Sequence, residues 1–312
     1  MPSLFETVTG QRAAVRDLSD RGLVRVTGAD RVRFLNGMLA NDIAALEPGE
    51  VAPSLLLDRK GHVLAELWVL VEPEAILLDV APGLEAELAG VLEKHIIADD
   101  VALASLSAEV AQLGLEGPAA REAAPALGVT ALALGRFERV DFAGESLIAI
   151  AGGSLGDDGL RVLVPRAALG RVRVALALPE LSREAAEVLR IEAAIPALGR
   201  DLTTRNFPQE ARLERAFSLS KGCYVGQEIV ARIASRGAVN RLLVKLRTRE
   251  LVAPGAEIRV GDTVAGQVTS SAVSAASGPI ALGYVRVAEA RAGVQVSVGA
   301  SAGEIVDDYS RR

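Results

Sequence analysis

Cysteine and histidine are nearly absent from this sequence of 312 residues, which contains one cysteine, Cys223, and two histidines, His62 and His95. One cysteine cannot form an internal disulfide, so the composition fits a reducing compartment. No CxxC or HxxxH spacing occurs, and zinc and iron–sulphur sites depend on such clusters. We therefore expect no metal site made by this chain alone.

Several other features are also missing. No apolar run reaches the roughly 18 residues of a membrane span. The first residues, MPSLFETVTG, lack the pattern of a signal peptide. The formal net charge is −6, which argues against a general nucleic-acid surface. The spellings GxSxG, Walker A and HExxH do not occur. We expect a cytoplasmic protein with no membrane contact and no direct contact with nucleic acid.

The order of elements predicts an α+β protein. Half of the residues are hydrophobic, and the length suffices for two or three domains. Strands and helices mix up to about residue 240, whereas later segments such as VNRLLVKLRT are short, alternating and separated by glycines. We expect residues 1–238 to form one α+β region and residues 239–312 a small β-module, in the form of a barrel.

Helical and strand periodicities predict the individual elements. We expect a helix from Gly28 to Leu46 with Asp30 as its N-cap, three strands between Ser54 and Val80, and a later helix capped by Ser182. Residues 116–136 are rich in Ala, Gly and Pro, and fit either a loose helix or a connection between subdomains.

Five segments together carry a resemblance to a known family. They are VTGADRVRFLNGMLANDI, LLLDRKGHVLAEL, LRIEAAIPALGRDLTTRNFPQEARL, LSKGCYVGQEIVARI and GQVTSSAVSAASGPIALGYVR. In this order and spacing the chain resembles the YgfZ-type folate-binding proteins, which are similar to the aminomethyltransferase (T-protein) of the glycine cleavage system. The resemblance covers residues 20–305, and KGCYVGQE is its most specific part.

This resemblance implies a three-lobed fold, with two ferredoxin-like α+β lobes, interleaved in residues 1–238, and a C-terminal β-barrel. It implies a central channel that binds tetrahydrofolate or a derivative. It also implies a role in assembling or repairing iron–sulphur clusters, including those of tRNA-thiolating (tRNA-modifying) enzymes. The implied partners are the folate and iron–sulphur client enzymes or assembly proteins, and the implied state is a monomer.

Two departures argue against active aminomethyl transfer. T-proteins resemble one another in a Gly-Gly-x-x-Asp-Asp-Leu stretch, where an aspartate holds the reacting end of the folate. Here Ala65 and Glu66 occupy those two positions. Misplacing a reacting group by about 1 Å can cost about 100-fold in rate. T-proteins also tend to have Asp-Phe where this chain has Cys223 and Tyr224. Whether the chain catalyses any reaction stays open at this point.

The resemblance also points to folate contacts. Asp157 lies at a position where T-proteins have a glutamate that contacts the pterin, although GDDG also fits a plain hairpin turn. Arg190 and Glu192 match an Arg-x-Glu pair of the family. A guanidinium can pair with folate carboxylates, but a helix-face ion network explains the pair equally well. We expect the pterin near Asp157 and Arg190.

The KGCYVGQE loop is the remaining candidate, at the mouth of the channel. Gly222 and Gly226 would let its backbone approach a ligand, and Lys221 would lower the pKa of the Cys223 thiol if its ammonium faced the sulphur. We take Cys223 and Lys221 as the candidate reactive pair. Tyr224, Gln227 and Glu228 are candidate cofactor contacts: the first could stack or merely support the loop, and the other two offer an amide and an acceptor.

Three functions stay open on the sequence. The first is a folate-binding accessory protein of iron–sulphur metabolism with a functional cysteine. The second is a folate-dependent aminomethyl- or methyltransferase that uses Glu66 or Asp58 in place of the missing aspartate. The third is a non-catalytic module in which folate is structural and the barrel docks a partner.

Overall fold

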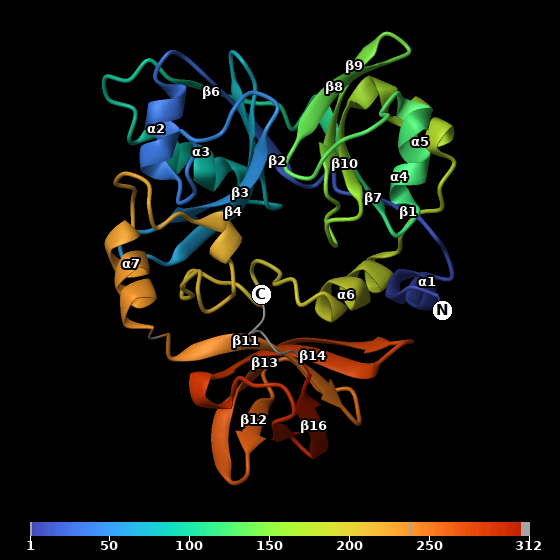
Figure 1. The fold of residues 1–312 in the computed structure, drawn as a ribbon, viewed down its shortest axis with the longest axis vertical. Coiled ribbons are helices and arrows are strands. Elements are labelled where there is room, and N and C mark those ends of the chain that lie inside the picture. Colours follow the sequence, from blue (N-terminus) through green and yellow to red (C-terminus); the bar gives the residue numbers. More distant parts are fainter. Residues whose placement is uncertain (1, 238, 307–312) are drawn as a thin grey trace.

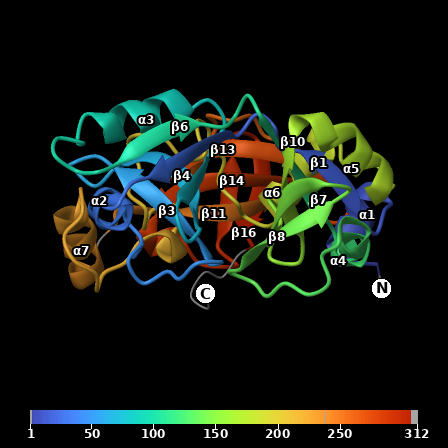
Figure 2. The ribbon, with the colours of Figure 1, turned by 90° about the horizontal axis from the view of Figure 1, so that it is seen from above.

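Two five-stranded antiparallel sheets and one closed barrel make up the fold of the computed structural model, which describes residues 2–237 and 239–306. The two sheets belong to two α+β lobes that lie side by side, and the barrel lies below both of them (Figure 1). Seen from above, the two lobes cover the barrel (Figure 2). The three lobes therefore meet around a common centre.

The first lobe contains the sheet β3-β4-β5-β2-β6. Its strands are β2 (Gly22–Thr27), β3 (Val51–Leu57), β4 (Val63–Val71), β5 (Ile76–Val80) and β6 (Ala102–Ser105). Its helices are α2 (Arg31–Met38) and α3 (Glu85–Glu93). Leu35 and Leu39 from the α2 region and Leu88 and Leu92 from the α3 region join the apolar side chains of the sheet in one core. Burial of this apolar surface is what stabilises the lobe.

The second lobe contains the sheet β1-β7-β10-β9-β8. Its strands are β1 (Ala14–Asp17), β7 (Val110–Glu116), β8 (Phe137–Phe142), β9 (Glu145–Ala151) and β10 (Leu160–Pro165). Its helices are α4 (Ala120–Ala123) and α5 (Leu169–Leu176), and α1 (Leu4–Thr9) contacts α6 (Arg183–Glu192). Because β1 pairs with β7, the whole first lobe is inserted between two neighbouring strands of the second.

The barrel closes in the order β11-β14-β13-β12-β15-β16. Its strands are β11 (Arg241–Thr248), β12 (Glu257–Val260), β13 (Thr263–Ser274), β14 (Gly278–Arg286), β15 (Gln295–Val298) and β16 (Ser301–Ile305). Gly266 allows β13 and β14 to approach closely, because a Cβ there would lie 1.8 Å from the carbonyl oxygen of Tyr284. Helix α7 (Gln227–Arg236) leads from the first lobe to the barrel.

A buried ion cluster joins the two sheets. Asp79 on β5 is 1% exposed, and its carboxylate accepts from Arg21 Nε at 2.5 Å. From the second lobe it accepts from Arg161 Nη1 at 2.9 Å and from Gln112 Nε2 at 3.0 Å. The Arg161 guanidinium also lies 4.2 Å from the ring centroid of Trp68 on β4. Buried charges need such partners, so this cluster fixes how the lobes face each other.

A second buried cluster joins the barrel to α6. Arg190 Nη1 donates to Asp201 at 2.6 Å, and Arg190 Nη2 donates to Ser270 Oγ on β13 at 2.7 Å. The hydroxyl of Tyr284 on β14 donates to the main-chain oxygen of Asp201 at 2.7 Å. Side chains from two barrel strands thus converge on the segment that leaves α6.

The expected α+β class is confirmed, with two antiparallel sheets and a six-stranded barrel. The three strands expected between Ser54 and Val80 are present, and Ser182 caps α6 by accepting from Ala185 N. Residues 116–136 contain α4, a 3-10 turn (Ala124–Leu127) and a connection. Residue 238, the last of the predicted first region, lies outside the described residues.

Asp30 is the N-cap residue of α2, as predicted, but its side chain makes no capping hydrogen bond. Its carboxylate instead binds Arg33 and accepts from the main-chain N–H of Asp100. The helix is also shorter than expected, since α2 ends at Met38. Within the described part of the chain, the helices are too short or too polar to cross a membrane.

We predict that Asp79→Ala destabilises the protein by about 3–5 kcal/mol, because it leaves the buried guanidinium of Arg161 and the partly buried one of Arg21 without their shared carboxylate. The free energy of unfolding, measured by urea titration, checks this. Asp262→Ala is the matched control, since Asp262 is exposed in the barrel. Equal stability of the two variants would contradict the prediction.

Candidate functional site

Lys221 ties the KGCYVGQE loop to the end of α2. Its Nζ donates to the main-chain oxygens of Asn36, Leu39 and Asn41 at 2.7, 2.6 and 2.6 Å. The last carbonyls of a helix lack partners within the helix and carry partial negative charge, so an ammonium group is well placed there. Lys221 is 9% exposed, and burial lowers its pKa to about 8.

This contact changes the predicted role of Lys221. Its three ammonium hydrogens are all directed to backbone carbonyls of the first lobe, so the group does not face the Cys223 sulphur as the sequence-based mechanism required. Lys221 is therefore a clamp that holds the loop.

The rest of the loop is fixed by further contacts. The ring of Tyr224 lies 4.7 Å from Lys221 Nζ, and its hydroxyl donates to the main-chain oxygen of Ser218 at 3.1 Å. Burial raises the pKa of Tyr224 to about 12. Gln227 Nε2 donates to the Lys221 carbonyl at 3.3 Å. Gly226 has φ +84°, and a Cβ there would lie 2.6 Å from the Asp58 carbonyl oxygen. Tyr224 and Gln227 thus support the loop from within.

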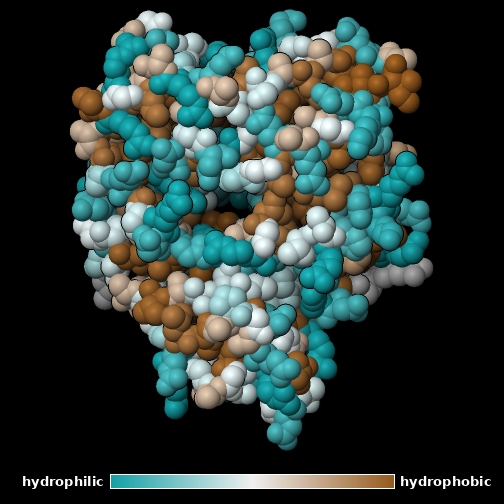
Figure 3. All heavy atoms as spheres, turned by 180° about the vertical axis from the view of Figure 1, so that it is seen from behind, coloured by the Kyte–Doolittle hydropathy of each residue, from teal (hydrophilic) through white to brown (hydrophobic). Residues whose placement is uncertain are grey.

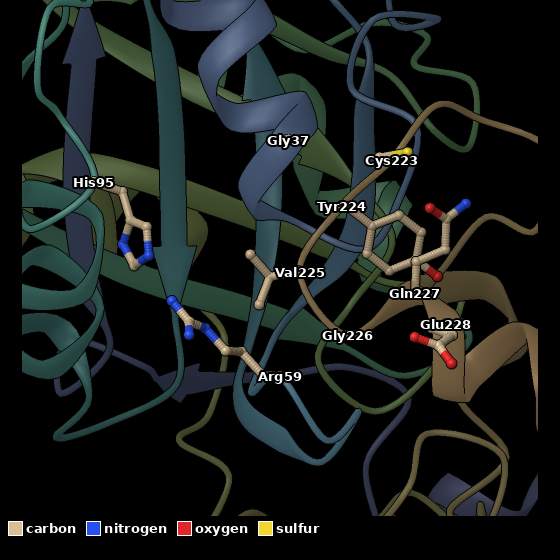
Figure 4. Close-up of a pocket in the computed structure, with 9 residues that line it drawn as sticks. All are labelled: Gly37, Arg59, His95, Cys223, Tyr224, Val225, Gly226, Gln227 and Glu228. Atoms are coloured by element: carbon tan, nitrogen blue, oxygen red, sulfur yellow. The ribbon is translucent and has the colours of Figure 1, made fainter.

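Cys223 is exposed on this fixed loop. It borders an open depression with a volume of about 480 Å³ (Figure 4), which is also lined by Gly37, Arg59, His95, Tyr224, Val225, Gly226, Gln227 and Glu228. Glu228, in the first turn of α7, pairs with Arg232 at 2.6 Å. The structure therefore brings Cys223, Tyr224, Gln227 and Glu228 together at one surface site.

The space between the three lobes is the second candidate site. Seen from behind, the surface is hollowed at its centre, where the two upper lobes and the barrel meet (Figure 3). Asp157 lies in the exposed turn between β9 and β10, and its carboxylate is 3.4 Å from Arg215 Nη1. Buried Glu116 anchors this turn by accepting from the main-chain N–H and the hydroxyl of Ser154, at 2.7 and 2.6 Å.

Arg190 and Glu192 differ in whether their side chains have hydrogen-bonding atoms without a partner. The five N–H groups of Arg190 are all engaged, by Glu187, Ile195, Asp201 and Ser270. This is the ion network that the sequence left as an alternative, and no donor remains for a folate carboxylate. Glu192 is buried, with Oε2 3.6 Å from Lys245 Nζ, and its Oε1 has no hydrogen-bond partner in the described part of the chain.

The positions that replace the T-protein aspartates lie on β4. Ala65 is buried in the core of the first lobe. Burial raises the pKa of Glu66, against the opposing effect of Arg21. Asp58 is committed to its own turn, where it accepts from the main-chain N–H groups of Lys60 and His62 at 2.8 Å. Neither Glu66 nor Asp58 therefore reproduces the carboxylate that the T-protein aspartate would supply.

Sequence reasoning missed the polar cluster around Asp79. Arg161 Nη2 and Gln112 Oε1 are buried in it without a partner among the described residues. The signal available was a charged or polar residue in the middle of an apolar strand, as in ILLDV and LRVLVP. Such a residue needs a buried partner, but the sequence does not indicate which one.

Two family models match this chain. Residues 7–221 match the GCVT N-terminal domain, and residues 241–307 match the glycine cleavage T-protein C-terminal barrel domain. Together they leave only the two ends and the segment around α7 unmatched.

Individual relatives agree with these matches. The chain is 30% identical over 305 residues to a chloroplastic protein of Arabidopsis thaliana named "putative transferase", with 94% of this chain and 70% of that protein covered. It is 29% identical over 315 residues to a "probable aminomethyltransferase" of Natronomonas pharaonis, with 96% and 88% covered. The crystal structure of glycine cleavage system aminomethyltransferase T from Bartonella henselae superimposes with a TM-score of 0.85 at 24% identity, covering 97% of this chain and 87% of that one.

We predict that Lys221→Met loosens the KGCYVGQE loop and lowers the free energy of unfolding by about 2–3 kcal/mol, because three carbonyls lose a charged donor. Hydrogen exchange across residues 221–226 and urea unfolding measure the two effects. Lys60→Met, at an exposed lysine, is the control. Unchanged exchange in the loop of Lys221→Met would show that the clamp does not hold it.

Proposed function

The chain belongs to the glycine cleavage T-protein family, and from this premise we propose that it binds tetrahydrofolate or a derivative between its lobes and serves iron–sulphur cluster assembly or repair through Cys223. The observation that carries the proposal is the exposure of Cys223, on a loop clamped by Lys221, beside an open depression. A fixed, accessible thiol suits transfer chemistry better than structural packing.

Glu192 supports the folate part of the proposal. A buried carboxylate oxygen without a partner is costly, and a bound N–H donor would remove that cost. A pterin ring carries amino and ring N–H groups that a carboxylate can accept. We propose Glu192 and the exposed Asp157 as folate contacts, and we do not assign Arg190 to the ligand because its donors are already used.

The replaced aspartates support a role other than aminomethyl transfer. Ala65 has no side-chain oxygen. Glu66 carries one methylene more than aspartate, which displaces its carboxylate from the position that an aspartate would give it. We therefore assign the reactive role to the exposed thiol of Cys223.

A folate-dependent aminomethyl- or methyltransferase remains the second candidate. It is favoured by the relatives, several of which are named aminomethyltransferases. Glu66 would have to supply the missing carboxylate, at the cost of ionising a buried acid. Folate-dependent one-carbon transfer that is lost in Glu66→Gln and kept in Cys223→Ser would favour this candidate.

We predict that tetrahydrofolate binds the wild-type protein and Cys223→Ser equally, and binds Glu192→Gln at least tenfold more weakly, since one hydrogen bond to a charged group is worth about 1.5–3 kcal/mol. Calorimetric titration under reducing conditions measures the dissociation constants. Asp262→Asn, in an exposed barrel turn, is the control for a lost carboxylate. Absence of binding to the wild type would remove the folate part of the proposal.

We also predict that Cys223→Ser fails to support an iron–sulphur enzyme that thiolates tRNA. In cells that lack this protein, wild type should restore the thiolated nucleosides, measured by mass spectrometry of digested tRNA, and the variant should not. Ser220→Ala, a change in the same segment, should restore them fully. Full restoration by Cys223→Ser would limit the protein to a folate-binding role without thiol chemistry.

A further inference from the structure

We propose that Arg59 and His95 form an anion-recognition subsite beside Cys223, which holds a carboxylate or similar group of the small molecule that meets the thiol. The proposal rests on the proposed function of Cys223 and adds the charge of its reaction partner. Arg59 and His95 are 36 positions apart in sequence, and both line the depression that Cys223 borders (Figure 4).

Arg59 offers a free guanidinium on a fixed base. It lies in the turn between β3 and β4, which Asp58 closes by accepting from the main-chain N–H groups of Lys60 and His62. The turn packs against α7, because a Cβ on Gly61 would lie 3.1 Å from Ile229 Cβ. Arg59 itself has no side-chain hydrogen bond or ion pair with any described residue. Such a planar, permanently charged fork binds carboxylates through two parallel hydrogen bonds.

His95 adds a second, oriented group. Its Nδ1 lies 2.8 Å from the main-chain oxygen of Val91, which can only accept, so Nδ1 carries a hydrogen. Nε2 then donates to an anion in the imidazolium form of the ring, which an anion beside it favours. In Figure 4 the His95 ring and the Arg59 guanidinium lie on the same side of the Val225 side chain, and both line the depression.

Arg59 supplies the permanent positive charge of the depression. Glu228 is the single carboxylate among the described lining residues, and it is paired with Arg232. Glu228 also lies in the first turn of α7, where it offsets the partial positive charge of the helix end. The charge offered to a ligand here is therefore that of Arg59.

The size of the depression indicates a small molecule. Its volume of about 480 Å³ lies within the range of about 300–1,000 Å³ that is usual for small-molecule sites. The thiol lies at the edge of this volume, on the same side as the start of α7 (Figure 4). Arg59 and Cys223 lie toward opposite ends of the lining in this view, so a compound that reaches both would span the depression.

Two disulfide reagents test the subsite without knowledge of the natural ligand. One is dianionic 5,5′-dithiobis(2-nitrobenzoate), and the other is neutral 2,2′-dipyridyl disulfide. With each, the Cys223 thiolate attacks the S–S bond, a mixed disulfide forms and one aryl thiolate leaves, so release can be followed by absorbance. The ratio of the two second-order rate constants, at fixed pH, measures selection for the anion.

We predict that this ratio falls about three- to fivefold in Arg59→Ala, which corresponds to the upper end for an exposed ion pair. The rate with the neutral reagent should stay unchanged, and the wild-type ratio should fall as salt is raised. Arg249→Ala, which removes the same charge from an exposed barrel residue, should leave the ratio unchanged.

An unchanged ratio in Arg59→Ala would overturn the subsite. An equal fall in Arg249→Ala would also overturn it, because the ratio would then depend only on the electrostatic field of the whole protein. Equal slowing with both reagents would also overturn it, because Arg59 would then act on the loop. These outcomes are independent of the proposed function, since the reagents involve neither folate nor a cluster. Failure of the folate titration or of the tRNA assay would leave the measured ratio intact.

Discussion

The carboxylate of Asp79 is the interaction on which the arrangement of the lobes depends. It lies on the first sheet and accepts from Arg21 of its own lobe and from Arg161 and Gln112 of the other. Around it the two sheets meet through apolar side chains that tolerate many relative positions. Charge pairs in an interface without water tolerate few relative positions. If one partner is displaced, the other charge stays buried and unpaired in a medium of low dielectric constant. The shape of the central hollow follows from this constraint.

The same principle recurs at the other two junctions. Arg190 joins α6 to the barrel through Ser270, and Lys221 fixes the KGCYVGQE loop to α2. Each junction places a buried cation against oxygens from a different lobe or segment. Cys223 is the exception, since it is exposed on the loop that Lys221 and Tyr224 hold in place. A rigid support with one free reactive group is the arrangement that positions a thiol without burying it.

Much of this could be predicted from the sequence where the information was local. The strands between Ser54 and Val80, the cap at Ser182 and the loop around Cys223 all follow from short patterns. The partners of Lys221 could not be predicted, because Asn36 lies 185 positions away. Neither could the engagement of Arg190 by Ser270, which requires the barrel to be docked. The N-cap position of Asp30 followed from the sequence, but its long-range contact with Asp100, which takes the place of the local capping bond, did not.

The insertion of one lobe into the other has a consequence for biosynthesis. Strand β1 leaves the ribosome early, but its partner β7 follows only after the entire first lobe has been made. Domains generally fold as units during synthesis, and non-local pairing is slow. We therefore expect the first lobe to fold on the nascent chain while β1 waits unpaired, with its edge open to wrong partners. Folding of the second lobe, which must wait for synthesis of the first, is therefore the step of biosynthesis most exposed to misfolding.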